Sequence, residues 1–176
     1  MSRLEKSKGL YETIMIFDLI KKKHKNFKLY ICGDGTEKNN LISKINNRND
    51  IQYFGYVKGN EKKTIFLSSD IFIFPTTHGE GMPNALLEAM AFGIPILTRS
   101  VGGINDFFIN GEHGFSTEST SPDIFSEYID KLVTDVELYN YIRSNNIALA
   151  KKMFSPDVVA NRITEIVDKT LLSNQV

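Results

Sequence analysis

Short apolar segments alternate with amphipathic segments through roughly the first hundred residues, and this alternation limits the possible folds more than any other feature. The apolar segments end at or near glycine or proline turns, as strands do, and they are 27–32, 51–54, 70–75 and 95–98. Helical spacing of apolar residues marks the intervening segments, which are 10–24, 41–45, 62–68 and 83–92. Strands and helices that alternate in this way predict a parallel sheet.

The apolar run within 70–75 is continuous, as in parallel strands that are covered on both faces. The predicted fold class is therefore α/β, a Rossmann-like, doubly wound parallel sheet with helices on both faces. From Ser121 onward only helical periodicity is present, and the last helix is predicted from Pro156 to Leu172. The 176 residues, of which 41% are hydrophobic, suit one domain spanning 1–176 with a helical C-terminal end.

The charge balance limits the possible partners. Twenty-one basic and twenty-one acidic side chains give a net charge of zero, which predicts no nucleic-acid partner. No apolar run approaches the roughly 20 residues that span a bilayer, and no signal-peptide pattern is present, so a cytoplasmic location is expected. The basic run Lys21–Lys25 could contact an anionic membrane, but a solvated helix end that complements the helix dipole is favoured.

The single cysteine, Cys32, excludes an internal disulfide and any site that needs several cysteines. Because Cys32 lies within an apolar strand, a buried structural thiol is favoured over a redox role. His24, His78 and His113 lack the spacing of metal ligands, so no metal site is predicted.

In a doubly wound sheet, ligands bind beyond the carboxyl ends of the strands, and the loop after Pro75 is the most informative of these loops. It leads into a helix whose first N–H groups, near Asn84 and Ala85, suit a phosphate. Glu80 and Glu88 flank this helix start and could accept hydrogen bonds from sugar or ribose hydroxyls. Taken alone, two such carboxylates favour the simpler interpretation, in which Glu80 is a capping acid and Glu88 is a solvated helix residue.

The segment 80–97 resembles the signature of the group 1 (family 4) retaining glycosyltransferases, which use nucleotide-diphospho-sugars. Further segments resemble the motifs of this family in the expected order: 2–4 with 8–9, 29–35, 54–57, 102–103 and 110–115. The resemblance covers nearly the whole chain and implies the C-terminal, donor-binding half of a two-domain GT-B glycosyltransferase.

The resemblance implies three catalytic residues. Arg3 and Lys8 would hold the donor diphosphate and neutralise the charge that develops as the glycosidic bond breaks. Glu80 would hold the hydroxyls of the donor sugar. The implied reaction retains the anomeric configuration, with a donor phosphate oxygen helping to deprotonate the acceptor and no protein nucleophile. Because the sequence has no Asp-X-Asp pair, metal independence is expected, and no cofactor is predicted.

The resemblance also implies the residues that bind the donor. Glu88 would bind the ribose hydroxyls, and the backbone near Tyr56 and Val57 would contact the base. The N–H groups of Asn84 and Ala85 would contact the distal phosphate. Gly33, in the glycine turn, and Met82, in the signature loop, complete the implied substrate-binding set.

The family places a strand and an acceptor-binding domain before the segment that contains Arg3. We therefore expect a donor-binding half with an incomplete first strand, inactive alone, whose last helix presents an apolar strip to the absent domain. A glycan or lipid-linked acceptor would be bound through that domain, with peripheral membrane association possible for the full-length enzyme. A UDP-hexose or UDP-N-acetylhexosamine donor in bacterial surface polysaccharide synthesis is favoured.

Two alternatives remain open: a nucleotide-sugar epimerase or phosphorylase of the same architecture, and a nucleotide-binding module without chemistry. A nicotinamide cofactor is disfavoured because Lys38 and Asn84 stand where the third glycine of each Gly-X-Gly-X-X-Gly pattern would be.

Overall fold

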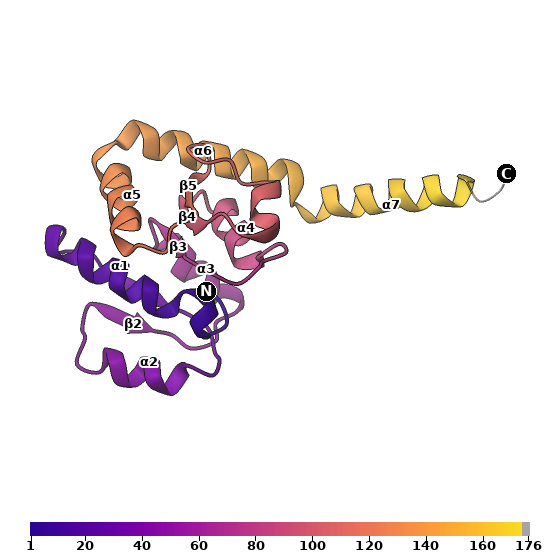
Figure 1. The fold of residues 1–176 in the computed structure, drawn as a ribbon. Helices are drawn as coiled ribbons and strands as arrows, with labels where there is room; N and C mark the ends of the chain where they lie inside the picture. The colour runs from indigo at the N-terminus through magenta and orange to yellow at the C-terminus, as the bar shows by residue number, and fades with distance from the viewer. Residues whose placement is uncertain (174–176) are drawn as a thin grey trace.

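The computed structural model describes residues 1–173, with side chains described to Leu171, and shows strands and helices alternating along the chain (Figure 1). The strands are β1 (Leu29–Ile31), β2 (Ile51–Tyr53), β3 (Phe72–Phe74), β4 (Ile96–Arg99) and β5 (Gly114–Thr117). The helices are η1 (Lys6–Lys8), α1 (Leu10–Lys23), α2 (Lys38–Ile45), α3 (Gly59–Leu67), α4 (Asn84–Ala91), η2 (Gly102–Asp106), α5 (Pro122–Thr134), α6 (Val136–Met153) and α7 (Pro156–Ser173).

Every strand and helix predicted from periodicity is present, and α1 and α4 lie within a residue of their predicted ends. The sequence analysis missed β5, which begins at Gly114 and has only one large apolar residue, Phe115. It also placed the start of α3 at Lys62, whereas the helix begins at Gly59. The prediction of a wound, parallel α/β fold is confirmed.

All strand pairs are parallel, but the strands form two separate sheets. One has the order β1-β2 and the other β3-β4-β5. Side chains alternate across the larger sheet, so Leu97 of β4 faces one core while its neighbour Ile96 faces the other. The two faces are therefore both covered, as the continuous apolar run of β3 requires.

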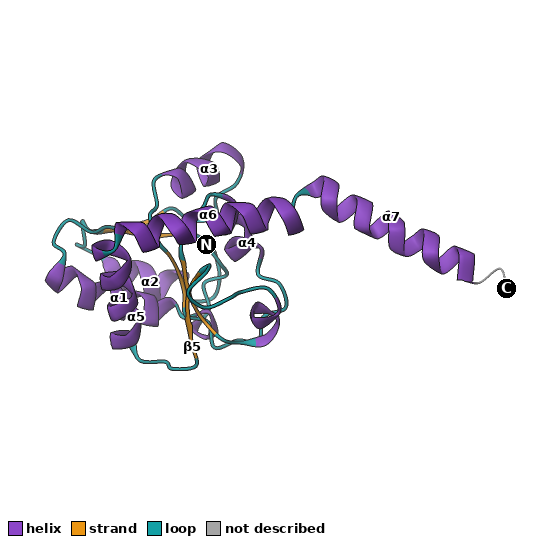
Figure 2. Cartoon of the chain, turned by 90° about the horizontal axis from the view of Figure 1, so that it is seen from above, coloured by secondary structure: helices purple, strands orange, loops and turns teal. Residues whose placement is uncertain are grey.

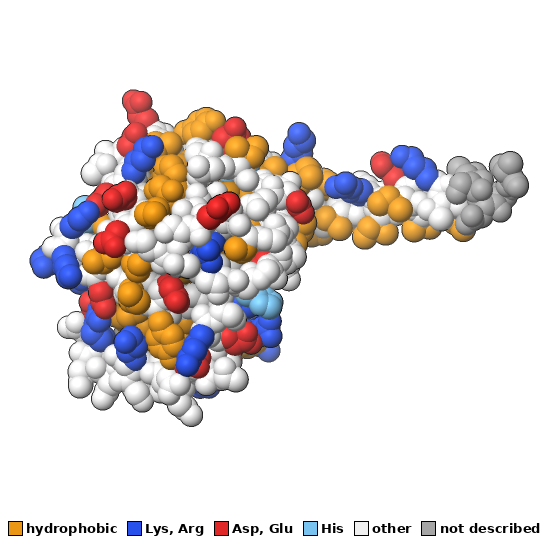
Figure 3. Space-filling model, in the orientation of Figure 1, with side chains coloured by type: hydrophobic (Ala, Val, Ile, Leu, Met, Phe, Trp, Pro, Cys, Tyr) orange, Lys and Arg blue, Asp and Glu red, His pale blue; other side chains and the backbone are white. Residues whose placement is uncertain are grey.

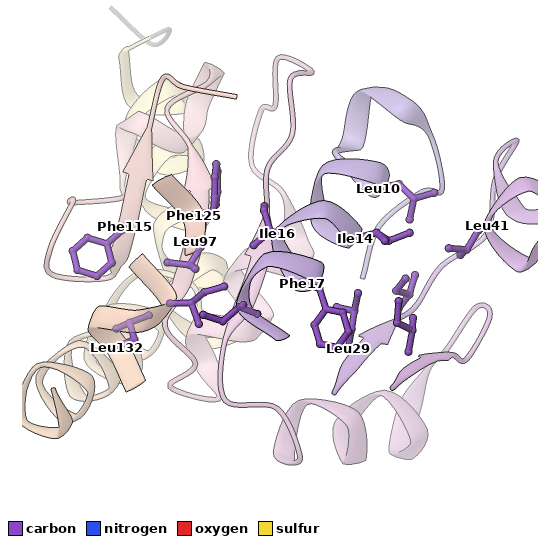
Figure 4. Packing of buried hydrophobic residues seen from close by; sticks show 14 of the residues in the cluster. Leu10, Ile14, Ile16, Phe17, Leu29, Leu41, Leu97, Phe115, Phe125 and Leu132 are labelled. Carbon is purple, nitrogen blue, oxygen red and sulfur yellow. The ribbon is translucent and has the colours of Figure 1, made fainter. Parts of the chain in front are cut away.

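One core joins α1 and α5 to the strands. Phe17 of α1 lies beside Leu29 of β1, while Ile16 lies on the side of Leu97 and Phe125 (Figure 4). Helix α1 packs against α5 over this face. The second core lies on the opposite face, where α4 packs against α6. Figure 2 shows β5 with α1 and α5 on one side and α4 on the other.

Capping explains where the tail helices begin. The Ser121 hydroxyl accepts a hydrogen bond from the N–H of Asp123 at the start of α5, and Pro122 occupies the first turn. The Asp135 carboxylate accepts one from the N–H of Leu138, which begins α6. These caps break the helical tail into separate helices although its periodicity is continuous.

Helix α7 extends away from the rest of the molecule (Figures 1 and 2). The predicted apolar strip is present along it, as the row of apolar side chains in Figure 3 shows. Its exposed members are Val159, Ile163, Ile166, Val167 and Leu171. No helix within residues 1–173 is long and apolar enough to cross a membrane.

The prediction of a buried thiol at Cys32 is confirmed, because the side chain is 3% exposed and packs with Val57 and Ile65. Burial raises the pKa of this thiol above its ordinary value. The thiolate, which is the reactive form, is therefore suppressed.

His113 is buried at the start of β5 and holds the turn before it. Its Nδ1 accepts a hydrogen bond from the N–H of Ile109 at 3.0 Å, and its ring packs against Phe108. Burial lowers the pKa of His113 below 6.5, so the folded protein keeps the ring neutral at a pH where the unfolded chain binds a proton.

We therefore predict that His113 lowers the stability of the fold in mild acid. As the pH falls below about 6.5, the unfolded state gains protons at His113 that the folded state does not, so the free energy of unfolding falls. Urea denaturation at pH 7.5 and pH 5.5 should show a larger fall for the unmodified chain than for His113→Gln. Equal falls in the two proteins would contradict this assignment.

Candidate functional site

A buried ion pair lies between the first helical turn and the loop after β3. Lys8 Nζ lies 2.6 Å from Glu80 Oε1, and the two side chains are only 7% and 10% exposed. The Thr76 hydroxyl donates a second hydrogen bond to the same carboxylate oxygen, at 2.9 Å. Glu80 is therefore held by an ammonium and a hydroxyl. The interpretation of Glu80 as a simple capping acid is wrong, because the residue that precedes α4 is Pro83 and no side-chain hydrogen bond caps this helix.

The loop that carries Glu80 is held in place by its neighbours. The Ser7 carbonyl accepts hydrogen bonds from the N–H groups of Thr77 at 2.9 Å and His78 at 3.2 Å. On the other side, the N–H of Gly103 donates to the Glu80 carbonyl at 2.7 Å. The position of Glu80 is thus set by contacts with η1 and η2, which lie far from it in sequence.

Gly102 allows η2 to approach this loop. Its φ is +53°, and a Cβ atom there would lie 2.2 Å from the Glu80 carbonyl oxygen. We predict that Gly102→Ala lowers the stability of the fold by about 1–3 kcal/mol, because the backbone is strained and the loop must move.

The matched control is Gly79→Ala in the same loop, because a Cβ atom at Gly79 would meet nothing within 4 Å. Thermal unfolding should place Gly102→Ala several degrees below the control, at about 2–4 °C per kcal/mol for a chain of this length. If both variants melt at the same temperature, the close approach of η2 does not hold the loop.

Glu88 lies on α4 and forms an ion pair with Lys62 of α3, with Lys62 Nζ 2.6 Å from its carboxylate. These side chains are 30% and 38% exposed for the lysine and the glutamate, so the pair is accessible to solvent. Glu88 is therefore not an isolated solvated residue. Among the described hydrogen bonds and ion pairs, none joins Glu88 to Lys8 or Glu80. Lys62 was missed by the sequence analysis because it belongs to an ordinary charged run, and only the packing of α3 brings it to α4.

The N-terminus of α4 presents unpaired donors. The carbonyl of Pro83 accepts from the N–H groups of Leu86 and Leu87, whereas those of Asn84 and Ala85 have no acceptor within residues 1–173. Met82, just before this turn, is 55% exposed. Asn84 and Glu88 also line a cavity of about 400 Å³ between α4 and the end of α6.

The remaining predicted residues lie around the loops after β1 and β2. Gly33 has a φ of +139°, and a Cβ atom there would lie 1.8 Å from the Ser2 carbonyl oxygen. Tyr56 is 75% exposed, whereas the side chain of Val57 is buried and leaves only its backbone for a ligand. Arg3 is 66% exposed at its side chain and pairs with Glu5 at 3.1 Å.

The structure thus brings Lys8 and Glu80 into direct contact and leaves Arg3 apart from them. A cation and free helix N–H donors are groups that can hold an anion, and carboxylates such as those of Glu80 and Glu88 can accept hydrogen bonds from hydroxyls. A cavity of about 780 Å³ between the two sheets is lined by only one of the predicted site residues, Lys8.

The family model described as "Glycosyl transferases group 1" matches residues 1–148. The chain belongs to the group 1 glycosyl transferase family. The capsular polysaccharide biosynthesis glycosyltransferase CapM of Staphylococcus aureus is 29% identical over 163 residues, or 90% of this chain and 42% of CapM. The chain therefore spans less than half the length of this relative.

Solved structures show the same fold. The Anabaena protein HepE in complex with UDP superposes with a TM-score of 0.83 at 20% identity, over 96% of this chain and 47% of HepE. The C-terminal domain of the group 1 glycosyl transferase LpcC from Francisella tularensis superposes with a TM-score of 0.77 at 24% identity, over 89% of this chain and 84% of that domain. The fold is that of the C-terminal domain of a GT-B glycosyltransferase.

Proposed function

We propose that this chain binds the nucleotide-sugar donor of a retaining glycosyltransferase. That enzyme would transfer a hexose or N-acetylhexosamine from a UDP-sugar to a glycan or lipid-linked acceptor in the synthesis of a bacterial surface polysaccharide. The observation that carries the proposal is the buried Lys8–Glu80 pair beside a loop that leads to the unpaired N–H groups of α4. The family match supports the reaction class, and the names of CapM and of the HepE complex support the acceptor class and the uridine donor.

The division of roles follows from the chemistry of each group. The Lys8 ammonium has three N–H bonds, and the contact with Glu80 uses one, which leaves two for the diphosphate. The N–H groups of Asn84 and Ala85 would add further donors to a phosphate oxygen. Glu80 would accept hydrogen bonds from the sugar hydroxyls, and Glu88 from the ribose hydroxyls.

In this proposal the diphosphate leaves without help from a metal ion. Negative charge builds up on the leaving phosphate as the bond to the anomeric carbon breaks, and Lys8, Arg3 and the N-terminus of α4 would stabilise it. A donor phosphate oxygen would take the proton of the attacking acceptor hydroxyl, so no side chain needs to act as nucleophile. The configuration at the anomeric carbon would then be retained.

Two measurements test the proposal. Calorimetric titration of this chain with UDP, GDP and ADP should show binding of UDP, and the absence of binding by all three at millimolar concentration would exclude the donor site. The complete enzyme that contains this chain should transfer sugar from a UDP-sugar to an acceptor in the presence of EDTA, with a product of retained configuration by NMR. Formation of an epimerised donor or a sugar phosphate would instead identify an epimerase or a phosphorylase.

A further inference from the structure

One oxygen of the Glu80 carboxylate takes all of its described hydrogen bonds. Oε1 accepts from the Lys8 ammonium at 2.6 Å and from the Thr76 hydroxyl at 2.9 Å. These two bonds fill the two lone pairs of that oxygen. Oε2 accepts no hydrogen bond within residues 1–173, and it is not among the buried polar atoms that lack a partner, so it reaches solvent. Glu80 therefore presents one free carboxylate oxygen.

The other predicted site glutamate, Glu88, has an ammonium partner but no described hydroxyl partner, and its carboxylate is held differently. Lys62 Nζ lies 2.6 Å from Oε1 and 2.6 Å from Oε2 of Glu88, so the ammonium meets both oxygens. The terminal torsion of a glutamate is broad, which lets the carboxylate turn into this arrangement. At Glu80 the hydrogen bond and the ion-pair contact of Lys8 both go to Oε1. Among the described contacts, the Thr76 hydroxyl is the partner that distinguishes the two carboxylates.

The single proton of the Thr76 hydroxyl is directed to Glu80. Thr76 Oγ1 also lies 3.1 Å from the Ser7 carbonyl oxygen, but a hydroxyl donates only one proton. That carbonyl already accepts from the N–H groups of Thr77 and His78, and the charged carboxylate is both the nearer and the stronger acceptor. Thr76 is 0% exposed, so water does not compete for the hydroxyl. The hydroxyl is therefore a fixed donor to Oε1.

We propose that Thr76 is a positioning residue for donor recognition, which orients the Glu80 carboxylate so that Oε2 stays free for a hydroxyl group of the donor sugar. Because Oε1 is saturated, the sugar donates to Oε2, while the remaining N–H bonds of Lys8 stay available to the diphosphate. A carboxylate that is already oriented loses little rotational freedom when the sugar binds, which favours binding. This inference rests on the proposed role of Glu80 in holding the donor sugar.

The test compares two substitutions of Thr76 in the 176-residue chain. Thr76→Val keeps the shape of the side chain and removes the hydroxyl, whereas Thr76→Ser keeps the hydroxyl. In both variants the Ser7 carbonyl retains its two N–H donors, so the loop after β3 keeps these backbone contacts. The matched control is Thr77→Val, because the exposed Thr77 hydroxyl lies 3.3 Å from the same carbonyl oxygen and makes no described hydrogen bond to Glu80.

Calorimetric titration measures the affinities for UDP and for four UDP-sugars: UDP-glucose, UDP-galactose, UDP-N-acetylglucosamine and UDP-N-acetylgalactosamine. The quantity compared is the ratio of the affinity for the tightest UDP-sugar to the affinity for UDP. In Thr76→Val this ratio should fall by about three- to tenfold, the effect of one ordinary hydrogen bond, while the affinity for UDP changes by less than about twofold. Thr76→Ser and Thr77→Val should keep the ratio of the unmodified chain.

An unchanged ratio in Thr76→Val, or equal losses for UDP and the UDP-sugar, would show that Thr76 only supports the fold. An unmodified chain that binds UDP but no UDP-sugar more tightly would also overturn the inference, whereas the absence of UDP binding would overturn the proposed function itself. A crystal structure of the unmodified chain with the UDP-sugar gives a second readout that needs no variant. A sugar hydroxyl should lie within about 3.2 Å of Glu80 Oε2, and a sugar that donates to Oε1 or contacts neither oxygen would contradict the inference.

Discussion

Lys8→Met should lower kcat/KM of the complete glycosyltransferase by about 10²–10³-fold, which is the usual effect of removing one preorganised donor to a developing negative charge. The Lys8 ammonium, which is proposed to bind the diphosphate, is buried and fixed against Glu80, so we expect that water would not take its place in this variant. Methionine keeps the length and apolar character of the side chain, and removes its charge. Steady-state rates with a saturating acceptor and varied donor measure the effect.

Loss of one partner from a buried ion pair also destabilises the fold, by about 3–5 kcal/mol, so the activity change needs controls. Lys6→Met removes an exposed ammonium from the same η1 turn and should leave both the rate and the Tm unchanged. The double variant Lys8→Met/Glu80→Gln removes both charges and should regain much of the lost stability while remaining inactive. Recovery of activity together with stability in the double variant would show that Lys8 is only structural.

The sequence predicted the strands and helices well where their patterns were strong. The run Ile71–Phe74 is apolar throughout, and α1 has apolar residues at regular helical spacing. The strand β5 was missed because Gly114, Ser116 and Thr117 give it no comparable pattern, and parallel pairing with β4 is what stabilises it. The separation of the sheets could not be predicted either, since it depends on which edges find partners in three dimensions.

The candidate site was predicted in its residue types but not in its contacts. Lys8 and Glu80 are 72 positions apart, and their pairing follows from the hydrogen bonds between Ser7 and the loop after β3. The contact between Lys62 and Glu88 depends on the packing of α3 beside α4, which leaves no pattern in the sequence. Motif resemblance located the loops, and only the fold shows that Arg3 pairs with Glu5 instead of joining Lys8.

Glu88→Ala should weaken the binding of UDP and of the UDP-sugar equally, by about 10–100-fold, because hydrogen bonds donated to a carboxylate contribute about 1.5–3 kcal/mol. Both ligands carry the ribose that Glu88 is proposed to bind. The fold should be little affected, since the Lys62 pair is partly exposed and such pairs contribute about 0–1 kcal/mol. Calorimetric titration of each variant with both ligands measures the two dissociation constants.

Glu80→Ala should have the opposite selectivity. UDP lacks the sugar that Glu80 is proposed to hold, so its affinity should stay constant or rise as the Lys8 ammonium loses its carboxylate partner and turns fully to the diphosphate. The extra affinity for the UDP-sugar should disappear. Glu127→Ala, which removes an exposed carboxylate from α5, is the matched control and should change neither constant. Since the two glutamates contact different lysines, equal losses for both ligands in both variants would mean that sugar and ribose are not recognised separately.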